Sequence, residues 1–214
     1  KATVKYCIMS VIGSGLFLLS TSMLYGITGQ LLMQPAHQAI QAIASDPTGQ
    51  YMLPLTVTFL LYMASIAIKS ALFPFHTWLP DAHGSATTSS SAVLSGLVLK
   101  GYIVLLIKLM YRVYGFEVIR GMGVLPVLFG LGALAMIVGS IMAFRQTDLK
   151  RMIAYSSVAQ IGDIFLGIGL GNAVGLTIAC FHIIAHAFTK SMPFVSAGAR
   201  RHATGGKKEN SDMA

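Results

Sequence analysis

Residues 124–144 read VLPVLFGLGALAMIVGSIMAF and contain no charged side chain. A helix needs about 20 apolar residues to cross the hydrocarbon core of a bilayer, which is roughly 30 Å thick. This stretch therefore predicts a transmembrane helix, and five further stretches of similar length accompany it along the chain.

The composition of the 214 residues also points to a membrane protein. Apolar residues make up 55% of the chain and charged residues 10%, and the mean hydropathy is +0.71. About a quarter of the residues of a soluble domain are charged. The surplus of apolar side chains must therefore face lipid. The two cysteines, Cys7 and Cys180, lie in apolar stretches without metal-ligand spacing and are interpreted as packing residues.

The apolar stretches predict an all-α integral membrane protein of about six transmembrane helices, one of them broken by proline. The predicted spans cover residues 4–29, 51–75, 91–111, 124–144, 152–171 and 173–198. They form one transmembrane domain over residues 1–199, followed by a polar basic tail over residues 200–214. The polar segment 30–50 is predicted to be an interfacial loop.

The N-terminal end resembles a signal sequence at first sight, because Lys1 and Lys5 precede an apolar run of roughly 20 residues. That run is too long for the apolar core of a signal peptide, and no small-residue cleavage site follows Gly29. The sequence also does not begin with Met. These features predict that the chain begins inside a longer protein.

Lysines and arginines are distributed unequally between the two predicted sides of the membrane. One side carries only Arg112 and Arg120. The side shared by both termini carries Lys1, Lys5, Arg145, Lys150, Arg151, Arg200, Arg201, Lys207 and Lys208. Because cytoplasmic loops carry the excess of basic residues, both termini are predicted to be cytoplasmic. This placement accounts for the formal charge of +8 without a nucleic-acid partner.

Four lysines lie within apolar segments: Lys69, Lys100, Lys108 and Lys190. A charge at membrane depth costs several kcal/mol on most scales, so such residues indicate function unless they snorkel to the headgroups. Lys108 is close to the end of its span, and snorkelling is the better interpretation there. Lys100 lies near the midplane, and a functional role is favoured for Lys100, Lys69 and Lys190.

The sixth predicted span reads FHIIAHAFTKSMPF and places His182, His186 and Lys190 four residues apart. This spacing aligns the three side chains on one face of a helix. Histidine titrates near neutral pH, so the three groups could line a proton pathway. Either histidine alone could be a hydrogen-bonded packing residue, but three aligned groups weaken that interpretation.

The same spacing of His182 and His186 also suits zinc, so a membrane-embedded zinc hydrolase is an alternative. The zinc protease pattern has Glu directly after the first His, whereas Ile183 stands here. No Ser/His/Asp constellation or phosphate-binding loop is recognisable. The glycines of GIGLGNAVG, residues 167–175, are interpreted as helix packing beside a short turn.

The end of the second predicted span reads KSALFPFHTWLPDAH, residues 69–83, and contains Pro74 and Pro80. Proline ends or breaks a helix. A broken helix beside Lys69 would indicate a hydrated cavity, because irregular backbone at membrane depth must be paired by protein or water. The alternative is an ordinary polar loop with Trp78 as an interfacial anchor. The Ser/Thr run at residues 87–91 is predicted to be a capping turn.

Four ordered blocks carry a resemblance to a known family: FPFHTWLPDAH with SAVLSGLVLKGY, AFRQTDLKRMIAYSSVAQIG and FHIIAHAFTK. They resemble the antiporter-like membrane subunits of complex I, Mrp-type sodium/proton antiporters and membrane-bound hydrogenases. The resemblance implies an inverted-repeat fold of about fourteen helices, of which this chain would be a fragment covering roughly helices six to eleven.

The resemblance also implies a proton relay. Lys69 matches the lysine of the family's first broken helix, and Lys100 matches the relay lysine of the next helix. His182, His186 and Lys190 match the helix that carries protons onward through a water chain. Burial favours the neutral form of a lysine, and a nearby carboxylate favours its charged form. A change in the distance or charge of the carboxylate would therefore make the lysine release or take up its proton.

Some positions depart from the family pattern. The glutamate that partners the first lysine and the second broken helix both lie outside this chain. Asp163 stands where the family usually has an aromatic or apolar residue, and Thr88 to Ser90 replace a Pro-containing stretch. Pro193, Arg200 and Arg201 are also atypical.

The implied function is proton, or cation and proton, translocation by one subunit of a multi-subunit redox-driven pump in a prokaryotic inner membrane. Expected partners are the other membrane subunits of a respiratory, hydrogenase or antiporter complex, the lipid bilayer, and protons or Na⁺. No cofactor and no redox centre is recognisable in the sequence. The alternatives are a Na⁺/H⁺ antiporter subunit, the zinc hydrolase, and a scaffold or inert fragment whose buried charges only snorkel.

Overall fold

The computed structural model describes residues 2–46 and 49–203, and these residues form helices and turns without a strand. Six helical stretches of this part of the chain are long and apolar enough to cross a membrane: Ala2–Thr28, Met52–Lys69, Thr88–Tyr114, Leu125–Phe144, Leu149–Gly169 and Ala173–Arg200. The predicted all-α membrane fold is therefore confirmed. The last helix continues to Ala203, and the rest of the predicted tail lies outside the described residues.

Five of the spans are single helices, and the third is a succession of four shorter elements. The single helices are α1 (Ala2–Thr28), α3 (Met52–Lys69), α8 (Leu125–Phe144), α9 (Leu149–Gly169) and α10 (Ala173–Ala203). The third span consists of α5 (Thr88–Val93), the π-helical turn η2 (Leu94–Val98), α6 (Leu99–Lys108) and a second π-helical turn, η3 (Leu109–Tyr114). The connections contain α2 (Met33–Ala44), η1 (Phe75–Thr77), α4 (Trp78–Ser85) and α7 (Phe116–Gly121).

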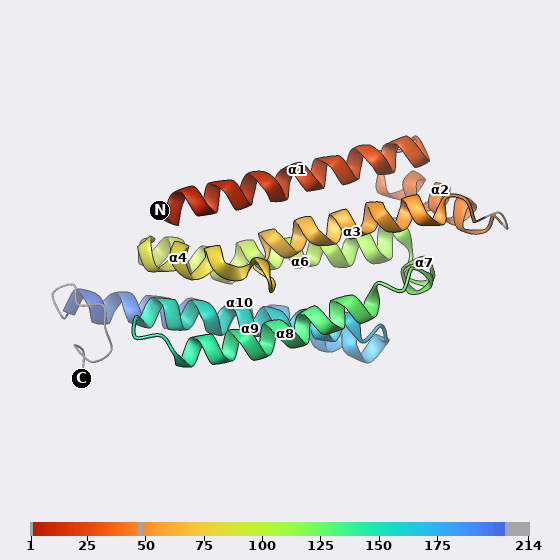
Figure 1. Cartoon of the computed structure of the whole chain (residues 1–214). Coiled ribbons are helices and arrows are strands. Elements are labelled where there is room, and N and C mark those ends of the chain that lie inside the picture. The colour runs from red at the N-terminus through yellow and green to blue at the C-terminus, as the bar shows by residue number, and fades with distance from the viewer. Residues whose placement is uncertain (1, 47–48, 204–214) are drawn as a thin grey trace.

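The long helices run side by side along one common direction (Figure 1). The N-terminal end of α1 and the C-terminal part of α10 lie at the same end of the bundle, at the left of the view. The short helices α2 and α7 lie at the opposite end.

The helix of the second span ends earlier than predicted, at Lys69 instead of residue 75. Pro74 has no N–H group for a helical hydrogen bond, so the chain turns before it resumes as η1 and α4. Trp78 Nε1 at the start of α4 donates a hydrogen bond of 3.0 Å to the carbonyl oxygen of Ile68. This bond joins the two halves of the broken helix beside Lys69.

The segment predicted as an interfacial loop contains a helix, α2. Ala36 and Ile40 are spaced by one helical turn and are buried against the bundle. Gln41 donates a hydrogen bond of 2.9 Å to the carbonyl oxygen of Tyr114, which attaches α2 to the end of the third span. The apolar positions were too few to distinguish this helix from a loop in the sequence.

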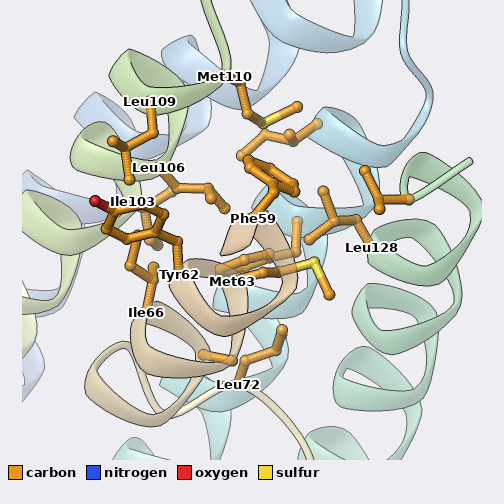
Figure 2. Close-up of a cluster of buried hydrophobic side chains, with 14 of the residues drawn as sticks. Phe59, Tyr62, Met63, Ile66, Leu72, Ile103, Leu106, Leu109, Met110 and Leu128 are labelled. Atoms are coloured by element: carbon orange, nitrogen blue, oxygen red, sulfur yellow. The ribbon is translucent and has the colours of Figure 1, made fainter. Parts of the chain in front are cut away.

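The main hydrophobic core lies where α3, the third span, α8 and α9 meet, and Figure 2 shows part of it. Its labelled side chains are Phe59, Tyr62, Met63, Ile66, Leu72, Ile103, Leu106, Leu109, Met110 and Leu128. Phe59 also packs edge-on against Tyr114, with ring centroids 5.1 Å apart. This packing fixes α3, which ends in Lys69, relative to α6, which begins beside Lys100.

Glycines bring α8 and α9 into close contact. A Cβ atom added to Gly139 would lie 2.7 Å from the backbone nitrogen of Ala159, and one added to Gly162 would lie 2.6 Å from the carbonyl oxygen of Gly132. Small residues allow helix backbones to approach in this way in membranes. The glycines at residues 167–175 pack as predicted, because a Cβ atom on Gly167 would lie 3.1 Å from the carbonyl oxygen of Gly175.

Candidate ion-translocation site

Lys100 lies inside the bundle with 4% of its surface exposed. It is the second residue of α6, which directly follows the π-helical turn η2. Its Nζ donates a hydrogen bond to the carbonyl oxygen of Ser95 in that turn. π-Helical turns interrupt the regular helical hydrogen bonding and are frequent at functional sites. A basic side chain is thus held within the bundle by a neutral backbone oxygen.

Two buried serines extend this contact to α9. The hydroxyl oxygens of Ser95 and Ser157 lie 3.1 Å apart. Ser157 also lies 3.0 Å from the carbonyl oxygen of Ile153, to which its hydroxyl can donate. A chain of polar atoms therefore leads from Lys100 into the interface between the third span and α9.

His182, His186 and Lys190 are neighbours along α10, as their spacing predicted. The rings of His182 and His186 are stacked, with centroids 5.9 Å apart and planes inclined by 24°. Lys190 Nζ donates a hydrogen bond of 2.7 Å to the hydroxyl oxygen of Ser156 on α9. These three residues, called the histidine row below, are therefore attached to α9 through Lys190.

The histidine nitrogens in this row are mostly unpaired. Both ring nitrogens of His186 and Nε2 of His182 are buried and have no hydrogen-bond partner among the described residues. Buried polar atoms are normally hydrogen-bonded, and an unpaired one requires an explanation such as a bound water or a functional role. Imidazole nitrogens can accept or donate a proton, so the row has the chemistry that proton transfer requires.

Electrostatic interactions connect Lys100 to this row. Lys100 interacts with Lys190, and His186 interacts with Lys100, Lys190 and His182. The structure thus brings together four of the five predicted relay residues where the third span, α9 and α10 meet.

Lys69 lies in a different place, at the C-terminal end of α3. Its Nζ is 5.2 Å from the centre of the Tyr102 ring, a cation–π arrangement. A cavity of about 20 Å³ adjoins Lys69 and is lined by Trp78, Tyr102 and residues of α1. A volume of that size can hold about one water molecule. Lys69 therefore lies beside both the helix break and a small cavity, as the sequence predicted for a broken helix.

The alternative interpretation of Trp78 as an interfacial anchor is wrong. Trp78 is 3% exposed and lies inside the protein, where its indole pairs with the end of α3. His83 on the same short helix is fully buried and stacks on Phe194, with ring centroids 4.5 Å apart. At the surface, Asp81 forms ion pairs of 2.9 Å with Lys5 and 3.5 Å with Arg151, which join α4 to α1 and α9.

The serines were not identified from the sequence. Ser95, Ser156 and Ser157 supply the hydrogen-bonding atoms around Lys100 and Lys190. The available signal was their occurrence within apolar helices, in LSG and AYSSVAQ. That signal alone does not separate these residues from Ser140, which bonds only to the carbonyl of its own helix at Met136 among the described residues.

Comparison with known proteins identifies relatives that match most or all of this chain. The sequence model described as NADH:quinone oxidoreductase/Mrp antiporter, TM, matches residues 1–214. The chain is 34% identical to NADH-quinone oxidoreductase subunit N of Desulforudis audaxviator over 207 residues, which cover 95% of this chain and 39% of that protein. It is 39% identical over 145 residues to subunit M of Rhodobacter capsulatus, covering 67% of this chain and 27% of that protein.

Two solved structures share the fold. The Mrp complex from Dietzia sp. contains a chain that superposes with a TM-score of 0.84 at 25% identity, covering 97% of this chain and 36% of that chain. An archaeal membrane-bound sulfane sulfur reductase contains one with a TM-score of 0.83 at 31% identity, covering 99% and 41%. The chain described here thus spans about two-fifths or less of the length of these relatives.

Proposed function

The chain belongs to the NADH:quinone oxidoreductase/Mrp antiporter transmembrane family, and we propose that it carries protons across a membrane as part of a multi-subunit redox-driven pump. The relatives named above are subunits or chains of respiratory and antiporter complexes. The buried basic residues of this chain would form the proton pathway.

The burial of Lys100 next to the histidine row is the observation on which this proposal depends. Lys100 is 4% exposed and bonds to a backbone oxygen, and among the described residues it forms no ion pair that would compensate a permanent charge at this site. Repulsion from Lys190 adds to the cost of that charge. A group whose charged form is this costly can release a proton readily, as a relay requires.

The proposed path runs from Lys69 through Lys100 to His186 and His182. The cavity beside Lys69 would hold water and admit the proton, and water would join Lys69 to Lys100. From Lys100 the proton would reach the unpaired nitrogens of His186 and then His182. Lys190, held by Ser156, would adjust the charge of this section.

The energy would come from the redox reaction of a partner subunit. The chain would lie in a prokaryotic inner membrane with both termini in the cytoplasm, in accord with its excess of basic residues at that end. Its partners would be the neighbouring membrane subunits of the complex and the surrounding lipid.

A Na⁺/H⁺ antiporter subunit is the second candidate function, because the Mrp chain superposes with a TM-score of 0.84. Proton movement would then require a Na⁺ gradient in the opposite direction, and measuring transport with and without Na⁺ separates the two.

The other two alternatives have less support. The described part of the chain contains no group of three or more His, Cys, Asp or Glu side chains that could hold a metal. The structure therefore adds no support for the zinc hydrolase. The scaffold hypothesis requires the buried lysines to reach the headgroups, whereas Lys100 turns to Ser95.

The test compares proton transport by the assembled membrane complex in vesicles for wild type, Lys100→Ala and Lys108→Ala. Lys108 lies on the same helix two turns further on and is exposed, so it is a matched control. We expect Lys100→Ala to abolish transport and Lys108→Ala to leave it nearly unchanged. Normal transport in both variants would contradict the relay and favour the scaffold.

A further inference from the structure

Asp163 is the only acidic residue within the six candidate spans of the described chain. It belongs to α9, where it lies six residues before the helix end at Gly169 and is half-buried. An ionisable residue in a membrane helix is costly and usually faces the bundle interior with a partner of opposite charge. The proposed pathway uses only basic groups and leaves this carboxylate without a role.

The alignment of α9 with α10 identifies the partner. The two helices are antiparallel, and two contacts fix their alignment: Gly167 lies against Ala179, and Ser156 binds Lys190. Asp163 is one turn from Gly167 toward Ser156, and His182 is about one turn from Ala179 toward Lys190. The two residues therefore lie at the same level along the paired helices.

The charges around the two residues agree with this alignment. Asp163 and His182 interact electrostatically, and Nε2 of His182 is buried without a hydrogen-bond partner among the described residues. His182 in turn stacks on His186, so a charge at Asp163 acts on the end of the histidine row.

Among the described residues, His182 is the charged or titratable group that acts electrostatically on Asp163. The residues of α8, Leu125–Phe144, include no titratable side chain. On α4, Asp81 pairs with Arg151 more than three turns away from Asp163, and His83 stacks on Phe194. On α10, His186 stacks on His182, and Lys190 lies two turns further from His182 and binds Ser156.

We infer that Asp163 and His182 form a proton-sharing pair that provides an additional step of the relay in this protein. The inference rests on the proposed function. When a proton arrives, the imidazolium of His182 passes it to the carboxylate of Asp163, which leaves a neutral imidazole and a neutral carboxyl group. The total charge of the pair does not change in this step. The pair can therefore hold a proton beside His186 without an additional buried positive charge.

The pair is tested by infrared difference spectroscopy of the full chain in lipid nanodiscs, with ¹³C-labelled aspartate, between acidic and alkaline buffer. We expect a protonated-carboxyl band that is sensitive to the label, lost in Asp163→Asn and shifted in His182→Asn. Asp81→Asn is the control, because Asp81 is a surface aspartate of α4 that pairs with Lys5 and Arg151, and the Asp163 band should be unchanged there.

Labelled carboxyl bands that are identical in wild type and Asp163→Asn, or an Asp163 band that His182→Asn leaves unshifted, would overturn the pair. Helix content by circular dichroism shows that each variant is folded, and Asp163→Glu should restore a protonated-carboxyl band that no longer responds to the aspartate label. In the assembled complex we expect Asp163→Asn to slow proton transport by about tenfold or more and Asp163→Glu to retain most of it; equal transport in Asp163→Asn and wild type would also contradict the inference.

The two proposals fail in different ways. If Lys100→Ala transports normally while His182→Asn still shifts the Asp163 band, the proposed relay fails and the pair stands. If Lys100→Ala abolishes transport while the Asp163 band is the same in His182→Asn as in wild type, the relay stands and the pair fails.

Discussion

Lys100 and Lys108 lie two turns apart on α6 in opposite environments. Lys100 is 4% exposed and bonded to Ser95, whereas Lys108 is exposed on the outside of the helix. Eight residues of an α-helix correspond to about 12 Å along its axis and 800° of rotation, which turns the side chain through about 80° to another face. The position along α6 and the side of the helix therefore make a charge costly on Lys100 but not on Lys108.

The polar atoms around Lys100 provide a test at the residue scale. Ser157→Ala removes the hydroxyl that lies beside Ser95 and leaves a buried group without its partner. We expect it to lower the free energy of unfolding by about 1 kcal/mol, as is typical of interhelical hydrogen bonds in membranes. Unfolding of the chain in bicelles by a denaturing detergent measures this change.

Ser140→Ala is the matched control, because Ser140 is exposed and its hydroxyl binds a carbonyl of its own helix. Its free energy of unfolding should stay within a few tenths of a kcal/mol of wild type. Equal losses in the two variants would mean that the contact between Ser95 and Ser157 does not stabilise the fold.

The sequence revealed the basic residues of the candidate site but not their partners. A lysine or histidine within an apolar run is conspicuous, so Lys69, Lys100, His182, His186 and Lys190 could be named from the sequence. Ser156 and Ser157 become partners only because α9 packs against α10 and the third span. Such contacts depend on the relative positions of separate helices, which no local pattern encodes.

At the scale of the elements, hydrophobic length predicted the six spans well but not their interruptions. The end of α3 at Lys69 follows from Pro74. A proline cannot donate a hydrogen bond to the carbonyl four residues earlier, so the helix ends before the proline itself. The π-helical turns η2 and η3 contain no proline, so no local sequence signal predicts them. α2 is short and buries only Ala36 and Ile40, so its apolar pattern does not distinguish a helix from a loop.

The contact between α8 and α9 yields a prediction for an element pair. Gly139→Ala places a Cβ atom 2.7 Å from the backbone nitrogen of Ala159, so the helices must separate. We expect a loss of about 1–3 kcal/mol in the free energy of unfolding, as for other overpacked sites. The same detergent titration in bicelles measures it.

Gly130→Ala on the same helix is the control, because a Cβ atom there meets nothing within 4 Å. It should be neutral or slightly stabilising, since alanine favours a helix more than glycine does. If Gly130→Ala destabilises the chain as much as Gly139→Ala, the loss comes from the helix itself and not from the contact between helices.

At the scale of the whole molecule, the bundle has two chemically different ends. The N-terminal end of α1, the C-terminal part of α10 and the connection from α8 to α9 lie at one end, while α2 and α7 lie at the other (Figure 1). Lys5, Arg145 and Arg151 belong to the first end, and Arg120 belongs to the second. The fold thus places basic residues from distant segments at one end of the bundle. The proposed orientation requires this, because the end with more basic residues faces the cytoplasm.

The orientation can be tested with two exposed arginines at opposite ends, Arg145 after α8 and Arg120 in α7. Each is replaced by cysteine in a background with Cys7→Ser and Cys180→Ser, because both native thiols are free and exposed. A membrane-impermeant thiol reagent added to intact cells should label Arg120→Cys. It should label Arg145→Cys only after the membrane is opened, since that site would face the cytoplasm.

The two sites have to differ, because α8 crosses the membrane between them. Labelling of both sites in intact cells would contradict the spanning of α8. The reverse pattern, with Arg145→Cys labelled from outside, would keep the fold but invert the orientation. The proposed proton path would then run in the opposite direction relative to the membrane, and Lys69 and its cavity would have to be approached from the other side of the bilayer.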